Sequence, residues 1–528
     1  MRTAFIQTLC KLAGRKPSVQ NRTLTALLSI ILLAIGIYLI RYFSDYGNWF
    51  IHPHQFEGHL PALLSGEPGL HLSSFAKIFH PLFDQRPRFL SYAIILLNLH
   101  LRMWLYQWLV LFPPFSLGWI FELIAGPYLL YLLLMNLTKD RVAVLAGLLV
   151  YMTSIGFLCG FAMPLMPGKP LTNVIFLATL YILSVAKKRM RPGQLFHEVA
   201  GGPVLAASLG AVLLAGLFLD EVPLFAFLLP FLFFPELFFP RTLSRADLIT
   251  AARAMAPLSA AALIFVLVAV VIVPRVTESL YGYHFDFFGT VEGRYAHYAK
   301  YVENLLPNFF SFFGLSTVPA TLAPLLKHPS GNGVVTGQEA NWIVVCVTLA
   351  AWTGLVYLAY ARSSAQAVFL RRTILATLLF VLFMSALSNF HVPFISGYVY
   401  GCGMAVFLAL LAGFAQTLTQ RVWSRRLVTG LIVGIALIQL FNFNAINRSW
   451  IEYHNERWTR PAHENELPIA QDGRHTTRAE LWNIWKAWKV GQLDVYLHDN
   501  QISSGAVFLI FELRYLDDSQ NAVSKPVG

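Results

Sequence analysis

Apolar runs of about 17 to 22 residues recur along this chain and are separated by short polar or basic segments. A helix needs about 20 apolar residues to cross the hydrocarbon core of a bilayer, so runs of this length predict membrane-spanning helices. Only 12 % of the residues are charged, which is about half the share found in soluble globular proteins. We therefore expect an all-α polytopic membrane protein and not a soluble enzyme.

Lysine and arginine are concentrated in the short segments between these runs. Six such segments, taken as cytoplasmic, carry 20 Lys and Arg residues against 3 acids, within a net charge of +12 for the whole chain. Cytoplasmic loops of membrane proteins are enriched in Lys and Arg. The basic balance therefore indicates orientation, with a cytoplasmic N-terminus and a periplasmic C-terminus, and does not indicate nucleic-acid binding.

About 11 transmembrane helices follow from the run lengths and from this charge pattern. The predicted crossings are 23–43, 114–137, 142–159, 171–186, 203–219, 222–239, 255–273, 342–360, 373–388, 398–418 and 427–443. The stretch 89–112 is predicted to be an interfacial helix on the external side, because one more crossing there would place the basic cluster 187–191 outside. A true crossing of 89–112 is the alternative.

Three parts of the chain are expected. They are a basic cytoplasmic arm at 1–22, a transmembrane domain at 23–443 with external loops 44–113 and 275–341, and a small external α/β subdomain at 444–528. The longest cytoplasmic segment is about 22 residues, too short for a soluble catalytic domain. Chemistry is therefore expected at the external face, on lipid-linked or exported substrates, and a bacterial inner membrane is the expected location.

Acidic residues at the external ends of helices are the first candidates for a site. Asp45 lies where the first helix leaves the membrane, and it could serve as a general base or pair with Arg41 one turn back. Asp220 and Glu221 follow the crossing 203–219 in a tight turn. Two adjacent carboxylates could cap the next helix, bind a divalent metal such as Mg or Mn, or organise a phosphate-containing donor.

Cationic residues in the same external segments would complete a phosphate-binding site. Arg86 and Arg88 precede the stretch 89–112, Lys169 lies in the turn before 171, and His391 lies in the turn before 398. A guanidinium binds phosphate oxygens well, and a Lys or His can neutralise a leaving phosphate. Together with the acids, these residues predict a site for a phosphate-linked substrate.

The order of these elements resembles the GT-C superfamily of polytopic glycosyltransferases, which includes protein O-mannosyltransferases and the aminoarabinose transferases of lipid A. The likeness spans about residues 20–440. Asp45 matches the family's acidic residue after the first helix, and Asp220-Glu221 matches its later acidic pair. The segments 86–92, 163–170 and 388–393 are similar to its Pro-containing juxtamembrane element and its external turns. Many relatives carry an acidic pair in the first loop, so Glu57 is an alternative counterpart of the first acid.

The resemblance implies transfer of a sugar from a polyprenyl-phosphate-linked donor to a glycan, lipid or protein acceptor at the external face. Asp45 would be the catalytic base, Arg86, Arg88, Lys169 and His391 would bind the donor phosphate, and Asp220 and Glu221 would bind a metal or organise the donor. Two alternatives share the topology. An envelope polysaccharide polymerase or ligase would rely on Arg294 and His297, and a lipid-linked sugar transporter would rely on acids within the crossings, such as Glu122.

Overall fold

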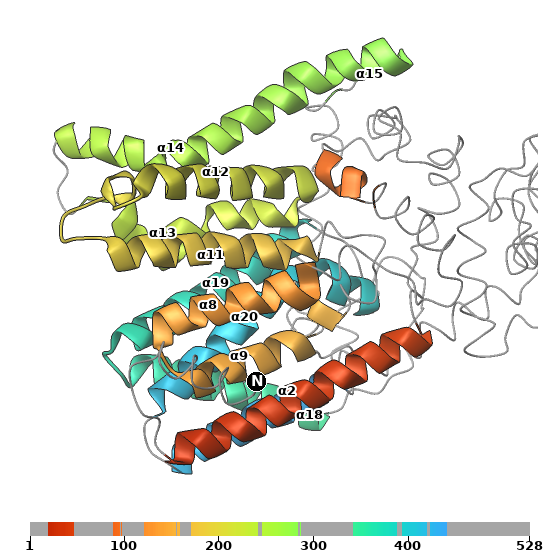
Figure 1. Ribbon diagram of the computed structural model, residues 1–528, viewed down its shortest axis with the longest axis vertical. Coiled ribbons are helices and arrows are strands. Elements are labelled where there is room, and N and C mark those ends of the chain that lie inside the picture. Colours follow the sequence, from red (N-terminus) through yellow and green to blue (C-terminus); the bar gives the residue numbers. More distant parts are fainter. Residues whose placement is uncertain are drawn as a thin grey trace, which may run out of the picture.

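The computed structural model describes the chain at residues 19–46, 88–94, 97, 121–154, 156–158, 170–240, 245–282, 286, 342–387, 393–419 and 423–440. These residues are almost entirely helical, and no strand occurs among them. Figure 1 shows the helices lying side by side along a common direction, with α14 next to α12. The described part of the chain is therefore an all-α bundle.

The elements fall into longer α-helices and short helical pieces, most of which are 3₁₀ or π-helical. The long helices are α2 (Val19–Tyr46), α8 (Gly126–Thr138), α9 (Arg141–Thr153), α11 (Leu171–Arg189), α12 (Gly202–Leu219), α14 (Arg245–Leu267), α15 (Val273–Tyr281), α18 (Trp342–Tyr360), α19 (Ala365–Leu387) and α20 (Pro393–Leu418). The short pieces are η2 (Phe121–Ala125), η3 (Phe196–Glu198), η4 (Val222–Phe227), α13 (Leu229–Phe233), η5 (Pro235–Leu237) and η6 (Val268–Ile272). A final described helix covers 423–440.

Six of the described helices are long and apolar enough to cross a membrane, as expected of a multi-pass membrane protein. They are Leu171–Arg189, Gly202–Leu219, Leu248–Leu280, Ala365–Met384, Gly401–Leu418 and Trp423–Leu440. The prediction of an all-α membrane protein is confirmed at this level. The count of about 11 crossings stays a prediction, and the predicted subdomain 444–528 lies outside the described residues.

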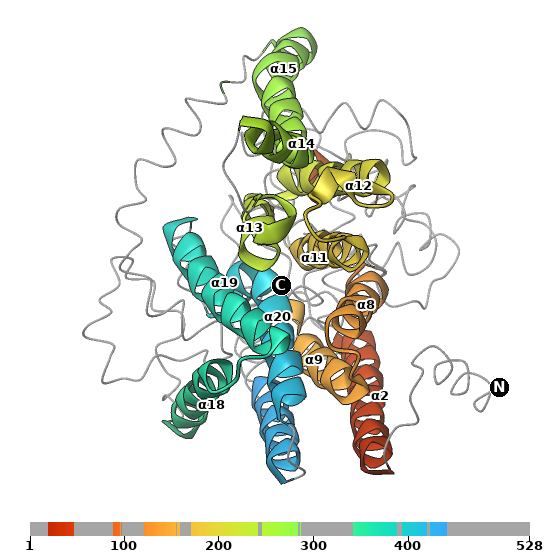
Figure 2. The same ribbon diagram turned by 90° about the vertical axis from the view of Figure 1, so that its left-hand side faces the viewer.

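The bundle has one central helix and several peripheral ones. Nearly all residues of α20 from Gly401 to Leu418 are buried, and α20 packs against α9, α19 and α11. Figure 2 shows α20 among these neighbours, with α14 and α18 on the outside. Peripheral helices expose large apolar side chains such as Val204 and Leu263. Exposed apolar faces on helices of this length are typical of contact with lipid.

Two predicted crossings differ from the structure. The segment 222–239 was expected to be one helix, but it consists of η4, α13 and η5 in succession. Pro223, Pro230 and Pro235 explain the interruptions, since proline lacks the N–H that a helix interior requires. The crossing 142–159 is also shorter as an α-helix, because α9 ends at Thr153 and Ser154 adopts an extended conformation.

Ion pairs join the basic turns of the chain at one end of the bundle. Arg425 Nη2 lies 2.5 Å from Asp140 Oδ2, and Glu236 lies 2.9 Å from Lys187 Nζ and 3.5 Å from Arg372 Nη2. We call this the basic end, comprising residues 136–141, 187–202, 236, 360–372 and 423–426. The charge pattern predicts that these turns share one side, and the contacts bring them together; which side of the membrane they face stays a prediction.

Candidate functional site

The acidic pair at the end of α12 forms a tight turn. Asp220 has an extended backbone after Leu219, and its Oδ1 accepts hydrogen bonds from the backbone N–H groups of Glu221 at 2.8 Å and Val222 at 3.3 Å. These bonds satisfy N–H groups at the start of η4 that would otherwise lack an acceptor. A Cβ at Gly216 would lie 2.9 Å from Pro223, so the turn folds back closely on α12.

Arg88 contacts both carboxylates of this turn. Its Nη2 lies 3.5 Å from Asp220 Oδ2, and the same nitrogen forms an ion pair with Glu221 Oε2. The side chains of Asp220, Arg88 and Glu221 are 3 %, 12 % and 20 % exposed, so Glu221 is the most accessible of the three. The structure thus brings Arg88 together with two predicted site residues that lie more than 130 positions further along the chain.

A short helix carries Arg88 to this position. The carbonyl of Arg88 accepts a hydrogen bond from Tyr92 N–H at 3.0 Å, and the helical turn 89–94 follows. The Phe89 ring lies 6.2 Å from that of Phe218 in α12, and Phe218 in turn contacts Phe265 of α14 at 5.4 Å. Aromatic packing therefore fixes the turn 89–94 on α12 and orients the guanidinium.

The site lies far from the basic end. Arg189 Nη1 donates to the Ala200 carbonyl at 3.3 Å, just before α12 begins at Gly202. A helix rises 1.5 Å per residue, so the 18 residues of α12 separate Asp220 from the basic end by about 27 Å. That separation is close to the thickness of the hydrocarbon core. The two polar groups therefore lie at opposite ends of the bundle.

The charges of the site decide what it can hold. Two carboxylates around one guanidinium leave a net charge of −1, and charge-assisted hydrogen bonds of this kind are strong and directional. The Arg88 guanidinium lies against both carboxylates and neutralises part of their charge; binding of a divalent ion by Asp220 and Glu221 stays a prediction. Within the described residues there is no group of three or more His, Cys, Asp or Glu that could hold a metal ion.

The other predicted site residues are located only in part. Asp45 lies in the last turn of α2, but its side chain is outside the set that the structure describes. Arg86, Glu57, Lys169 and His391 fall outside the described residues, as do Arg294 and His297 of the polymerase alternative. Their roles therefore stay predictions.

A break in α20 was not predicted from the sequence. Cys402 and Gly403 have non-helical dihedral angles, and Gly403 has φ 89°. Asn173, which is fully buried in the first turn of α11, accepts a hydrogen bond from Gly403 N–H at 2.6 Å through its Oδ1. The asparagine in an apolar run and the Gly-Cys-Gly triplet 401–403 are the signals that could have indicated this contact.

An aromatic cluster packs between the acidic turn and the α20 break. Phe225 of η4 lies 5.1 Å from Phe380 and 6.0 Å from Phe176, and Phe176 lies 5.7 Å from Phe407. All four rings are fully buried or nearly so. Because Phe225 follows Glu221 by four positions, this packing holds the start of η4 and the carboxylates in place.

Glu236, an acid within a predicted crossing, belongs to the basic end. It lies in η5, outside the six candidate membrane spans. Partial burial raises the pKa of Glu236, but its backbone hydrogen bond and the charges of Lys187 and Arg372 outweigh burial, so the pKa is lowered overall. A carboxylate held ionised by two cations is poorly suited to carrying protons. The structure describes no side chain for Glu122, the acid considered for transport.

Comparison with known proteins does not assign a function to this site. Comparisons with protein-family models, with curated proteins and with solved structures give no match. The likeness to GT-C glycosyltransferases therefore stays a prediction from the sequence. Any functional assignment rests on the chemistry of Arg88, Asp220 and Glu221 and on their place in the bundle.

Proposed function

We propose that this chain is a GT-C-type glycosyltransferase that moves a sugar from a polyprenyl-phosphate-linked donor to an acceptor at the external membrane face. The contact of Arg88 with Asp220 and Glu221, at the end of the bundle opposite the basic end, supports this proposal most directly. This contact joins Arg88 to the acidic turn Asp220-Glu221, and both were assigned to the donor phosphate. It lies at the end of the bundle where a lipid-linked headgroup would be.

The proposed reaction is a displacement at the anomeric carbon. Asp45 accepts the proton of the acceptor hydroxyl, the acceptor oxygen bonds to the anomeric carbon, and the bond from that carbon to the donor phosphate oxygen breaks. Polyprenyl phosphate leaves as an anion. A positioned base of this kind contributes about 10²–10⁴-fold to the rate.

Arg88 serves the leaving group in this proposal. Asp220 and Glu221 hold its guanidinium in one orientation, and a cation fixed before the reaction stabilises developing phosphate charge without reorganisation. Arg86, Lys169 and His391 add positive charge in the same role. In this proposal Asp220 and Glu221 therefore act as donor-organising residues, and binding of a divalent ion is their alternative role.

The test is the pool of lipid-linked sugars in cells that carry the wild-type chain, Asp45→Asn, Glu221→Gln or Glu278→Gln. Glu278 is an exposed acid on α15 and is the matched control for loss of one carboxylate. We expect a polyprenyl-phosphate monosaccharide to build up with Asp45→Asn and Glu221→Gln, and to be consumed with wild type and Glu278→Gln. All four proteins must be present in the membrane in equal amounts.

Other outcomes identify the alternatives. Accumulation of longer lipid-linked chains, with unchanged monosaccharide carriers, would contradict the proposal and indicate a polymerase or ligase. In that case, replacing Arg294 should abolish activity while Asp45→Asn retains it. If neither pool changes, a sugar-lipid transporter or a non-catalytic role replaces the glycosyltransferase proposal.

A further inference from the structure

The basic end carries more positive charge than its carboxylates neutralise. Its exposed cations come from the ends of helices and from the connections between them, and they lie on one end of the bundle. They are Lys139, Lys188, Arg189, Arg191, Arg362 and Arg426.

The acids described at this end are already engaged. Asp140 pairs with Arg425 at 2.5 Å, and Glu236 pairs with Lys187 and Arg372. Glu198 Oε2 accepts the backbone N–H of Leu195 at 2.8 Å. Among the side chains that the structure describes here, the carboxylates thus serve ion pairs or a helix turn, and the exposed cations form a surface with a strong positive excess.

Two arginines at this end lie over exposed aromatic rings. The guanidinium carbon of Arg371 is 5.7 Å from the centre of the Tyr360 ring, and that of Arg426 is 5.6 Å from the Trp423 ring. Tyr360 and Trp423 are 72 % and 79 % exposed. Exposed Tyr and Trp at the ends of apolar helices typically lie at the headgroup level of a bilayer. The cations beside them therefore lie at the height of lipid phosphates.

Apolar surface continues from these rings along the same helices. Tyr357 of α18 is 70 % exposed, and Leu427 of the helix 423–440 is 66 % exposed. A ligand that matches this surface carries a phosphate at the level of the cations and acyl chains along the helices below. A soluble phosphate or a nucleic acid matches only the first requirement.

We propose that the basic end binds the headgroups of anionic phospholipids through their phosphodiester groups. Lys and Arg donate to these oxygens, and each Lys or Arg near an anionic leaflet adds to the attraction. The proposal is independent of the glycosyltransferase assignment, because it concerns the opposite end of the bundle. It also places the basic end against the leaflet richer in anionic lipid, which is the cytoplasmic one.

The experiment measures binding of acyl-chain-labelled phosphatidylglycerol to the full chain in dodecyl maltoside micelles, by fluorescence anisotropy. Labelled phosphatidylcholine is the zwitterionic comparison. The test variant is Lys139→Gln/Arg191→Gln/Arg362→Gln. One control keeps the charge at the same three positions (Lys139→Arg/Arg191→Lys/Arg362→Lys), and the other, Arg275→Gln, removes an exposed cation from α15.

We expect wild type to prefer phosphatidylglycerol, and the triple Gln variant to bind it roughly tenfold more weakly or worse. The charge-retaining variant and Arg275→Gln should bind as wild type does. Equal binding of the two lipids, or unchanged binding by the triple Gln variant, would overturn the proposal. Competition by inorganic phosphate at micromolar concentration would also overturn it, because the site would then be one for a soluble anion. Thermal unfolding of each variant in pure phosphatidylcholine checks that the fold is retained.

Discussion

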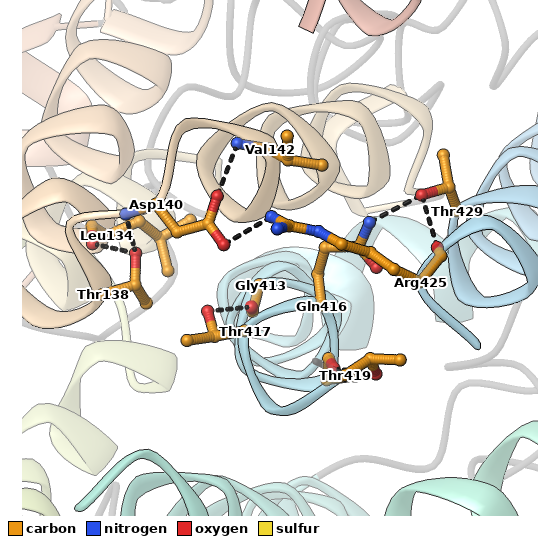
Figure 3. Close-up of polar contacts among 11 residues, drawn as sticks. Leu134, Thr138, Asp140, Val142, Gly413, Gln416, Thr417, Thr419, Arg425 and Thr429 are labelled. Atoms are coloured by element: carbon orange, nitrogen blue, oxygen red, sulfur yellow. Dashed lines mark hydrogen bonds and ion pairs between the residues drawn. The ribbon is translucent and has the colours of Figure 1, made fainter. Parts of the chain in front are cut away.

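Asp140 has two separate structural roles, and substitutions can distinguish them. Figure 3 shows one carboxylate oxygen accepting a hydrogen bond from the backbone of Val142, at 3.0 Å, and the other contacting Arg425 Nη2 at 2.5 Å. The first contact caps the N-terminus of α9. The second joins the α8–α9 turn to the start of the helix 423–440. Asp140 and Arg425 side chains are 21 % and 15 % exposed, so water screens the pair only in part.

The expected decreases in the free energy of unfolding follow from these contacts. Asp140→Asn keeps the cap, because Asn and Asp are about equally good at an N-terminus, but it removes the charge that Arg425 faces. A hydrogen bond to a charged group is worth about 1.5–3 kcal/mol, so we expect a loss of about 2 kcal/mol. Asp140→Ala also removes the cap, which adds about 1 kcal/mol. Arg425→Gln should lose about 2 kcal/mol, as Asp140→Asn does.

The assay is reversible unfolding in mixed micelles as the fraction of sodium dodecyl sulfate is raised, followed by circular dichroism. The double variant Asp140→Asn/Arg425→Gln completes a double-mutant cycle. We expect it to be about as destabilised as either single variant, since the ion pair can be lost only once. Additive losses in the cycle, or equal losses for Asp140→Asn and Asp140→Ala, would refute the reasoning.

Three further predictions use the same unfolding assay. Gly403→Ala should lower the free energy of unfolding by about 3 kcal/mol, because Gly403 has φ 89° and its new Cβ would lie 2.8 Å from two Phe rings. Gly434→Ala is the control. Nothing lies within 4 Å of its new Cβ, so this variant should be neutral or slightly stabilising. Asn173→Ala should lower the free energy of unfolding by about 1–3 kcal/mol, because it leaves the Gly403 N–H buried without its acceptor. Glu236 has a pKa below its ordinary 4.5 in the folded chain, so its stabilising contribution is complete above that value and is lost as the pH falls through the lowered pKa. Wild type should therefore lose more stability than Glu236→Gln between pH 7 and pH 3, and equal losses would contradict this.

The helices that the sequence predicts best are those bounded by clear signals. The expected crossing 342–360 coincides with α18, and the expected crossings 171–186 and 203–219 begin within one residue of α11 and α12. Each begins where a polar, proline-containing or glycine-containing segment gives way to an apolar run. Length and hydrophobicity are enough here, because such a run can satisfy its backbone in lipid only as a helix.

The two interrupted segments have different causes, one local and one tertiary. At 222–239 three prolines interrupt the helix locally, although the apolar character of the segment predicts a crossing. A 3₁₀-helix rises about 2.0 Å per residue instead of 1.5 Å, so the segment still reaches from the acidic turn to Glu236 and its contact with Lys187. The break in α20 depends on a close approach as well, since a Cβ at Gly156 would clash with the Gly401 carbonyl.

The site was predicted as separate parts. Arg88 was expected to bind phosphate, and Asp220 and Glu221 were expected to bind a metal or organise the donor. Residue types indicate such chemistry one residue at a time, but the pairing of groups 133 positions apart depends on how the turn 89–94 packs against α12. That packing depends on the contact between Phe89 and Phe218, which no local sequence pattern specifies.

The position of Arg88 can be compared with the distribution of cations along the chain. Cations are concentrated at the basic end, and Arg88, about 27 Å away at the other end of α12, does not follow that pattern. Its two carboxylate partners remove the conflict, because the group as a whole carries a net charge of −1. A guanidinium has five N–H donors, so Arg88 can contact both carboxylates at once. In the proposed donor site, the more exposed Glu221 would keep the guanidinium oriented while a substrate phosphate approaches, which is what electrostatic stabilisation of an anionic leaving group requires.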